Sequence, residues 1–394
     1  MKPYGKLFAV LLCAVVLLNP LNGAAAKDKK DEKPAYQFKT LTEVKRTPVK
    51  DQYHTGTCWC FSTISFLESE LLRMGKGELD LSEMYVVRRT YPLKALNYIR
   101  MQGNANHSQG GQSHDVIDQI RRFGIVPEAV YPGMKIEENR HNHGEMSTIL
   151  NALLKAVLEQ RGKRITPRWL EAYEAVLDVY LGTPPKTFEF NGQTYSPQQF
   201  AQYYLELNLD DYIELTSYNQ HPYYQKCRLE LPDNWTYNEN YYNVPIDDLE
   251  RVMDHALQTG YSLVWDGDVS EKEFETRKTG YAIVPEKEWD DKTKAEQEEE
   301  ITAPVKEREI TQEMRQKTFD NQTTTDDHLM HIVGIAKDQV GTKFYLTKNS
   351  GGSTDRKYDG YVYMSRSYVR LKTTAIMVNK HSLPPDLKEK LKVN

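Results

Sequence analysis

Two of the four cysteines in this chain of 394 residues lie one residue apart, in the stretch HTGTCWCFST over residues 54–63. Such a pair could form a metal clip, a disulfide, or a reactive thiol beside a structural one. Zinc sites normally use Cys-x2-4-Cys followed by a second ligand pair, and no second pair follows at workable spacing. A Cys58–Cys60 disulfide would be strained. We therefore predict a reactive thiol and expect neither a metal site nor a cofactor.

The residues after Cys58 have the periodicity of a helix. Apolar side chains recur at helical spacing over residues 61–74, so Cys58 is predicted at or near a helix start. A thiol attacks as the thiolate, and the N–H groups and dipole of a helix N-terminus favour that anion. Cys60 lies two residues further and points elsewhere on the helix. Cys58 is thus the candidate nucleophile, and Cys60 a small buried helix residue.

A cysteine nucleophile also needs a histidine base, an oxyanion donor and a group that orients the base. Gln52 lies six residues before Cys58, so its amide could supply one donor beside the Cys58 N–H. The stretch DHLMHIVG opens a predicted strand, and KNSGG, which contains Asn349, closes the next. On an alternating strand His328 and His331 point to opposite faces, so only one of them can be the base.

Several motifs resemble those of papain-like cysteine peptidases. DQYHTGTCWCFS resembles the active-site cysteine segment, LDLSEMYVV the segment after the active-site helix, and GGQSHDVIDQIRRFGIVPEAVYPG a glycine pair, helix and Tyr-Pro turn. DHLMHIVGI and KNSGG resemble the histidine and asparagine motifs, and GYVYM matches the C-terminal end. The family's histidine stands six residues before a glycine, as His328 does before Gly334. The resemblance therefore implies Cys58 as nucleophile, His328 as base, Asn349 as its orienting group and Gln52 as oxyanion donor.

The spacing of these motifs resembles one branch of the family. Cys58 and His328 are 270 residues apart, against roughly 130–150 in the compact enzymes. Such length is similar to the bleomycin hydrolase and aminopeptidase C branch. The resemblance implies an α+β fold with a helical lobe, an antiparallel β-barrel-like lobe, and large helical insertions at about 134–245 and 285–325.

The resemblance also implies residues that contact a peptide substrate: Gly110, Gly111, Trp59 and Asp327. Gly110 and Gly111 would present backbone to an extended peptide, a role that the lack of side chains favours. One position departs from the family, which usually has a tryptophan two residues after the asparagine. This chain has Gly351 there, so the Asn349–His328 bond would be less shielded unless another aromatic covers it.

Members of this branch carry a C-terminal arm that restricts them to aminopeptidase action, and they form hexameric rings. The tail HSLPPDLKEKLKVN reads as a short helix, with an arm shorter than usual. We expect an aminopeptidase that acts on peptides, in a homo-hexamer by resemblance. The alternatives are an endopeptidase with an open cleft and an inactive peptide-binding protein on the same scaffold.

Residues 1–26 are typical of a secretory signal peptide: two lysines, a short apolar run and an Ala-x-Ala end. We therefore predict a secreted or periplasmic protein whose peptidase domain spans residues 27–394. Without this segment the net charge changes from −5 to −7, and no basic stripe suggests nucleic-acid binding. No membrane association is expected after its removal. Three cysteines remain, so at least one is a free thiol.

Periodicity predicts further elements that would position these residues. We expect an extended segment at 38–50, helices at 114–123 and 245–259, and two helices within 145–181. Strands are predicted at 261–265, 328–336, 344–349, 360–364 and 374–378.

Overall fold

The structure is a computed structural model that describes residues 34–160 and 164–393. The chain divides into two units, residues 1–34 and 35–394, and the described helices and strands all belong to the second. The predicted signal peptide lies outside the described residues and stays a prediction.

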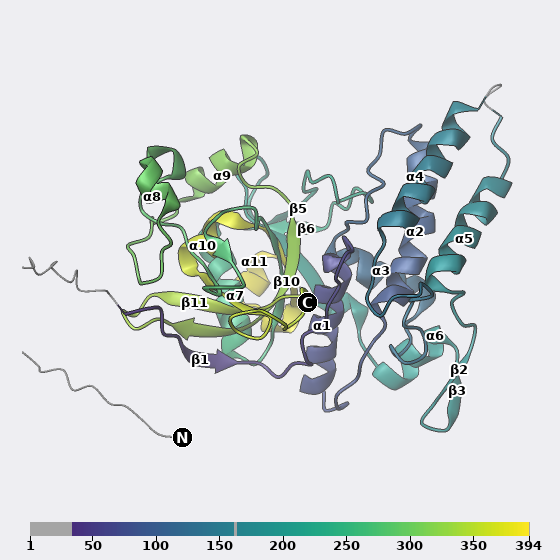
Figure 1. Cartoon of the computed structure of the whole chain (residues 1–394). Coiled ribbons are helices and arrows are strands. Elements are labelled where there is room, and N and C mark those ends of the chain that lie inside the picture. Colours follow the sequence, from purple (N-terminus) through teal and green to yellow (C-terminus); the bar gives the residue numbers. More distant parts are fainter. Residues whose placement is uncertain (1–33, 161–163, 394) are drawn as a thin grey trace, which may run out of the picture. The chain divides into compact units, whose positions relative to one another are not determined.

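One part of this unit is helical (Figure 1). It contains α1 (Cys58–Arg73), α2 (Glu83–Arg100), α3 (Ser113–Phe123), α4 (Gly144–Glu159) and α5 (Arg168–Leu181). Their apolar faces share one buried core that includes Trp59, Leu67 and Leu177. A hairpin of β2 (Phe188–Phe190) and β3 (Gln193–Tyr195), then α6 (Pro197–Gln199), η1 (Phe200–Leu205) and η2 (Leu209–Asp211), follow in the chain.

The other part is built on a sheet of eleven strands. Ten follow in the order β5 (Gln225–Cys227), β6 (Tyr241–Asn243), β4 (Tyr212–Thr216), β13 (Thr373–Asn379), β7 (Leu263–Gly267), β10 (His328–Lys337), β11 (Lys343–Lys348), β12 (Tyr361–Ser365), β9 (Tyr281–Ala282) and β8 (Phe274–Glu275). The eleventh, β1 (Lys39–Glu43), pairs with β10. Pairing is antiparallel except for β12–β9 and β4–β6.

A second buried core joins this sheet to α7 (Ile246–Gln258), α10 (Arg366–Lys372) and α11 (Pro385–Lys390). The remaining short helices are η3 (Trp289–Asp291), α8 (Lys294–Glu298), α9 (Gln312–Asp320) and η4 (Lys380–Ser382). Two cores, one helical and one on a largely antiparallel sheet, confirm the α+β, two-lobed prediction.

Most predicted elements are present within one or two residues of their expected ends. The prediction missed α2 and α10, and it missed β4, β5 and β6 in the tyrosine-rich stretch before α7. The segment 134–245 is therefore not purely helical, because β4, β5 and β6 extend the main sheet. The insertion and domain boundaries themselves stay predictions.

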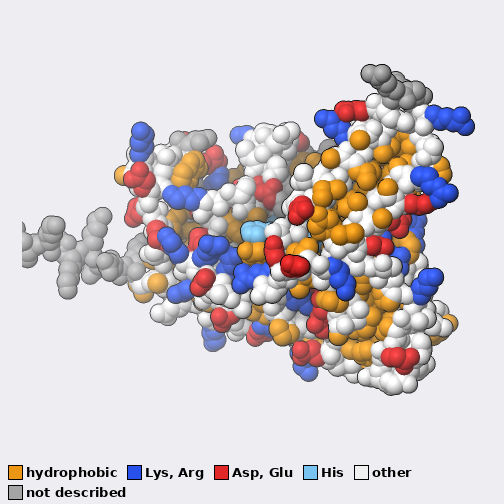
Figure 2. Space-filling view, turned by 45° about the vertical axis from the view of Figure 1, so that its right-hand side comes forward, with side chains coloured by type: hydrophobic (Ala, Val, Ile, Leu, Met, Phe, Trp, Pro, Cys, Tyr) orange, Lys and Arg blue, Asp and Glu red, His pale blue; other side chains and the backbone are white. Residues whose placement is uncertain are grey.

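The surface of the helical part carries exposed apolar side chains. Figure 2 shows hydrophobic side chains gathered on its right-hand side, and Val179 on α5 is 69% exposed. Within residues 34–160 and 164–393, no helix combines the length and the apolar character that crossing a bilayer requires.

Candidate active site

Cys58 is the first residue of α1, so the predicted helix begins at the cysteine itself. Its side chain is largely buried, with 8% of the residue exposed. Burial raises the pKa of the Cys58 thiol to about 12, although the approaching N–H of Leu329 partly favours the thiolate. This differs from the expectation that a helix start lowers this pKa. At neutral pH the thiol of the free protein is protonated.

Because α1 packs against β10, Cys58 at the start of the helix and His328 at the start of the strand lie at the same end of this pair of elements. The Ser65 hydroxyl on α1 hydrogen-bonds Nδ1 of His331 on β10 over 2.8 Å. From Ser65 back to Cys58 the helix covers roughly 10 Å, and from His331 back to His328 the strand covers roughly the same length. The N–H of Leu329, beside His328, approaches the Cys58 thiol. Cys58 thus lies beside the strand residue that follows His328.

The His328 ring is held by Asn349, which follows β11. Nε2 of His328 lies 2.8 Å from Oδ1 of Asn349. The same Oδ1 accepts the backbone N–H of Ser350 over 2.7 Å, which identifies it as the oxygen of the amide. Nε2 must then donate, so the neutral imidazole carries its proton there and leaves Nδ1 as a proton acceptor. Burial lowers the pKa of His328, while the bond to Asn349 opposes this, so the site favours the neutral ring.

The alternative histidine, His331, occupies a different environment. It is fully buried, and burial together with Lys348 and Arg46 holds its pKa well below the ordinary value. Its Nδ1 is bonded to Ser65, and its Nε2 has no hydrogen-bond partner among the described residues. Leu329 packs in the helical core and Met330 in the sheet core. Successive residues of β10 therefore face opposite sides of the strand, and so do His328 and His331, which are three residues apart.

Gln52 is fixed to the segment that carries Asn349. Its Oε1 accepts the Ser350 hydroxyl over 2.6 Å, and its Nε2 donates to the carbonyl of Thr55 over 2.8 Å. Its backbone N–H donates to the Ser350 carbonyl. An amide nitrogen has two hydrogens, so one N–H of Gln52 remains for another acceptor. The first N–H groups of a helix lack intrahelical acceptors, which leaves the Cys58 N–H available as well.

The position of the family's tryptophan is occupied by a cation instead of an aromatic ring. A Cβ added to Gly351 would lie 3.1 Å from an Arg356 guanidinium nitrogen. That guanidinium donates to the carbonyl of Gly351 and to the Thr276 hydroxyl. Arg356 therefore packs where a side chain at residue 351 would begin.

The predicted glycine pair packs against Trp59, the residue after Cys58, and against the carboxylate of Asp233. A Cβ on Gly111 would meet the Trp59 ring at 3.0 Å, and one on Gly110 would meet Oδ2 of Asp233 at 1.8 Å. Trp59 has no exposed surface, and its Nε1 donates to the Gln109 carbonyl over 3.0 Å. The ring thus lies beneath the glycine pair and supports it, and a substrate contact of Trp59 stays a prediction.

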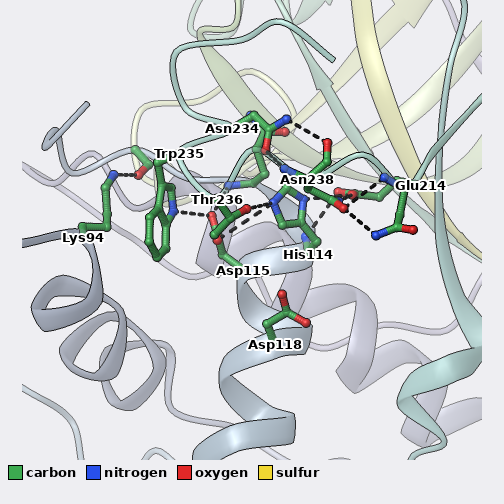
Figure 3. Close-up of polar contacts among 12 residues, drawn as sticks. Lys94, His114, Asp115, Asp118, Glu214, Asn234, Trp235, Thr236 and Asn238 are labelled. Atoms are coloured by element: carbon green, nitrogen blue, oxygen red, sulfur yellow. Dashed lines mark hydrogen bonds and ion pairs between the residues drawn. The ribbon is translucent and has the colours of Figure 1, made fainter. Parts of the chain in front are cut away.

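A polar network fixes the segment behind the glycine pair to the start of α3 (Figure 3). Asp115 accepts the Trp235 indole N–H over 2.9 Å, and His114 bonds Glu214 at 2.9 Å and Thr236 at 3.0 Å. Burial lowers the pKa of His114, but the charges of Glu214 and Asp115 outweigh burial and raise this pKa to about 9. The network therefore anchors residues 234–238 through a charged, buried histidine.

Asp327 is exposed, and its carboxyl bonds within its own segment. Its Oδ1 accepts the Thr325 hydroxyl over 2.8 Å. Burial and the nearby Asp268 raise its pKa. The carboxyls whose charges raise the pKa of Cys58 are instead Asp326, Asp266 and Asp233. The prediction missed these three, as it missed Gln112, whose Nε2 donates to Asp326 over 2.7 Å.

All three cysteines in the described part of the chain are free and buried. Cys60 is fully buried, and its thiol lies 3.3 Å from the Glu83 carbonyl. It is the small, buried helix residue that the sequence predicted. Within the same part of the chain, no cluster of three or more His, Cys, Asp or Glu side chains could hold a metal ion.

Comparisons with known proteins agree on one family. Residues 97–394 match the model of the peptidase C1-like family. Aminopeptidase G of Lactobacillus delbrueckii subsp. lactis is 24% identical over 89% of this chain and 85% of its own. Aminopeptidase C of Lactococcus lactis subsp. lactis is 22% identical over 58% of this chain and 61% of its own.

A solved structure shares the fold. PepW from Lactobacillus rhamnosis HN001 superposes with a TM-score of 0.68 at 18% identity, over 90% of this chain and 84% of that one. The family match, the relatives and this fold point to the same family. The chain therefore belongs to the peptidase C1-like family, as a papain-like cysteine peptidase of the aminopeptidase C branch.

Proposed function

We propose that this protein is an aminopeptidase that cleaves peptide bonds through a thioester on Cys58, with His328 as base and Asn349 as its orienting residue. The observation that carries the proposal is the Asn349 oxygen shared between the His328 Nε2–H and the Ser350 N–H. It fixes the tautomer in which Nδ1 can accept a proton.

The reaction starts from a neutral pair, because burial raises the pKa of Cys58 and lowers that of His328. As the sulfur attacks the carbonyl carbon, Nδ1 of His328 takes the thiol proton and the carbonyl oxygen becomes an oxyanion. The Cys58 N–H and the remaining N–H of Gln52 donate to that oxyanion. The C–N bond then breaks, and the imidazolium gives its proton to the leaving amine.

A thioester between Cys58 and the acyl part of the substrate remains. His328, neutral again, takes a proton from a water molecule that attacks the thioester carbon. The second oxyanion collapses, the acid product leaves, and the proton returns to the sulfur. Asn349 keeps the ring in one tautomer through both steps and stabilises the imidazolium.

The choice of an aminopeptidase rests on the relatives, several of which are aminopeptidases C, G and W. The direct test compares kcat/KM for an aminoacyl amide that has a free amino group with its N-acetylated form. We expect the free amine to be preferred. Preference for the acetylated substrate would overturn the aminopeptidase proposal in favour of an endopeptidase.

We further propose that residues 1–26 direct export of the enzyme. The support is the basic start, apolar run and Ala-x-Ala end of that segment. The N-terminal residue of the protein recovered from its native host tests this. Mature protein that still begins at residue 1 would contradict it.

Removing the Asn349 amide should change the pH dependence in a defined direction. Activity requires neutral His328, so kcat/KM rises with pH through a pKa below 6.5. The hydrogen bond that His328 donates to Asn349 raises this pKa, whereas burial lowers it. Asn349→Ala should therefore move the acidic limb to lower pH while lowering the plateau by about 10- to 100-fold, since the ring is less well oriented.

The control for this experiment is Asn321→Ala, an exposed asparagine after α9 that should leave the limb in place. Profiles of kcat/KM measured from pH 4 to 7 separate the outcomes. A limb that stays fixed or moves to higher pH in Asn349→Ala would contradict a neutral His328 as the base.

A further inference from the structure

Three carboxyl groups from separate parts of the chain lie close enough to the predicted nucleophile for their charges to raise its pKa. Asp233 comes from the loop before β6, Asp266 from β7, and Asp326 from the segment just before His328. After burial and the opposing Leu329 N–H, these three charges are the largest influences on the pKa of Cys58, and all raise it. They make the thiolate harder to form, so the proposed catalytic steps give no reason for their presence.

Asp233 lies directly against the glycine pair that is predicted to present backbone to the substrate. Its Oδ1 accepts the Asn106 amide and, over 3.0 Å, the Ser108 hydroxyl. Its Oδ2 faces Gly110, at the place a Cβ of that residue would occupy. The described residues provide no hydrogen bond to this Oδ2, so one oxygen of an oriented carboxylate is left for a ligand.

Asp266 is 2% exposed, and the Asp326 carboxyl and the Thr374 hydroxyl approach its oxygens without a close hydrogen bond among the described residues. Side chains two residues apart on a strand share a face, so Asp266 lies on the same face of β7 as Val264. Val264 packs in the helical core, which contains α1, whereas Trp265 packs in the sheet core. The Asp266 side chain thus points toward α1, whose first residue is Cys58. A buried carboxyl is costly unless a proton or a cation neutralises it.

Asp326 lies beside Asp266, and the two carboxyls influence each other. Burial raises the pKa of Asp266 to about 7, and burial followed by the charge of Asp266 holds the pKa of Asp326 well above its ordinary value. Near neutral pH this pair keeps a proton that an arriving cation could displace.

The nearby cations do not balance these acids. Lys94 donates to the Gly110 carbonyl, and burial lowers its pKa while Asp233, Asp115 and Asp326 oppose that change. The charged His114 is bonded to Glu214. The acids in this region are Asp115, Glu214, Asp233, Asp266 and Asp326. They outnumber the two cations, Lys94 and His114.

We propose that Asp233, supported by the remaining charge of the Asp266–Asp326 pair, binds the α-ammonium group of the substrate's first residue. The carboxylate lies on the glycine pair, so it would both attract a free amino terminus and obstruct a longer peptide that continues past it. This inference rests on the proposed peptidase function and deepens it, because it gives the residue that selects N-terminal bonds.

The test uses the full chain with Asp233→Asn, which keeps the size of the side chain and removes its charge. Glu239→Gln is the matched control, since Glu239 is exposed on the same segment. The substrates are one aminoacyl amide with a free amine and its N-acetylated form. Each variant is also treated with an uncharged epoxide. The mass increase at Cys58 reports whether the active site of that variant is intact.

We expect Asp233→Asn to raise KM for the free-amine substrate with less effect on kcat. The preference for the free amine should fall by about 10- to 100-fold, the value of a hydrogen bond to a charged group. Glu239→Gln should keep the wild-type preference. If Asp233→Asn lowers cleavage of both substrates in parallel, Asp233 has only a structural role and the inference is wrong.

Failure of this inference is distinguishable from failure of the proposed function. A wild-type enzyme that prefers the acetylated substrate would overturn the aminopeptidase proposal itself. A wild-type enzyme that prefers the free amine, with an unchanged preference in Asp233→Asn, would overturn only the role of Asp233.

Discussion

Replacing Cys58 by alanine should abolish peptidase activity, with kcat/KM lowered by about 10⁴- to 10⁶-fold. The reason is that the proposed acyl intermediate forms on the Cys58 sulfur, and the other thiol of α1 cannot replace it. Cys60, two residues away, is fully buried, and its thiol lies against the Glu83 carbonyl. Initial rates on an aminoacyl amide, with enzyme concentration taken from absorbance, give the ratio.

Cys60→Ala is the matched control for this substitution, because it removes the same sulfur from the same helix. Its loss leaves a small cavity and should change kcat/KM by only a few fold. Comparable activity in Cys58→Ala and the wild-type enzyme would rule out Cys58 as the nucleophile. Loss of activity in Cys60→Ala alone would reverse the roles assigned to the two cysteines.

Replacing His328 by glutamine should lower kcat by about 10³- to 10⁴-fold, because no group then takes the thiol proton or returns it to the leaving amine. Glutamine keeps a polar side chain beside Asn349, so the fold should be retained. The ratio is measured as kcat under saturating substrate, and the melting temperature reports the fold.

His331→Gln is the control on the same strand, and the two variants should differ in kind. His331 is buried and bonded to Ser65, so its replacement should cost about 1–3 kcal/mol of unfolding free energy. The folded fraction should retain most of the wild-type kcat. A large fall in kcat in His331→Gln with none in His328→Gln would identify His331 as the base.

The parts of the site that sequence could predict share one property: each lies on a strongly periodic element or in a distinctive motif. The apolar spacing after Cys58 predicted α1, and the alternation in 328–336 and 344–349 predicted the strands that carry His328 and precede Asn349. The alternation also assigned His328 and His331 to opposite faces. Those periods are direct consequences of helix and strand geometry.

The acidic side chains around Cys58 could not be found in this way. Asp233, Asp266 and Asp326 are far apart in the chain, and only the pairing of β7 with β10 places Asp266 opposite Leu329. The sequence pointed to Asp327 because it adjoins His328. One residue earlier, Asp326 accepts the Gln112 amide N–H, whereas Asp327 bonds Thr325. Long-range register, which local patterns do not encode, decides between them.

Two other differences have physical causes as well. The helix α2 contains Pro92 in its interior, and proline removes a backbone donor, so the local pattern argues against a continuous helix. The pKa of Cys58 was expected to fall at a helix start. Burial together with three carboxyl charges reverses that effect, and neither is visible in the residues next to the cysteine.

We propose that Cys58 alone is the reactive thiol of this peptidase, and covalent labelling distinguishes it from the other cysteines. The native enzyme is treated with a thiol-directed epoxide, and the modified residue is located by peptide mass spectrometry among Cys58, Cys60 and Cys227. We predict one label per chain, on Cys58, with loss of activity in proportion to labelling and no label in Cys58→Ala. Labelling of Cys60 or Cys227 with Cys58 unmodified, or full activity after Cys58 is labelled, would contradict the account.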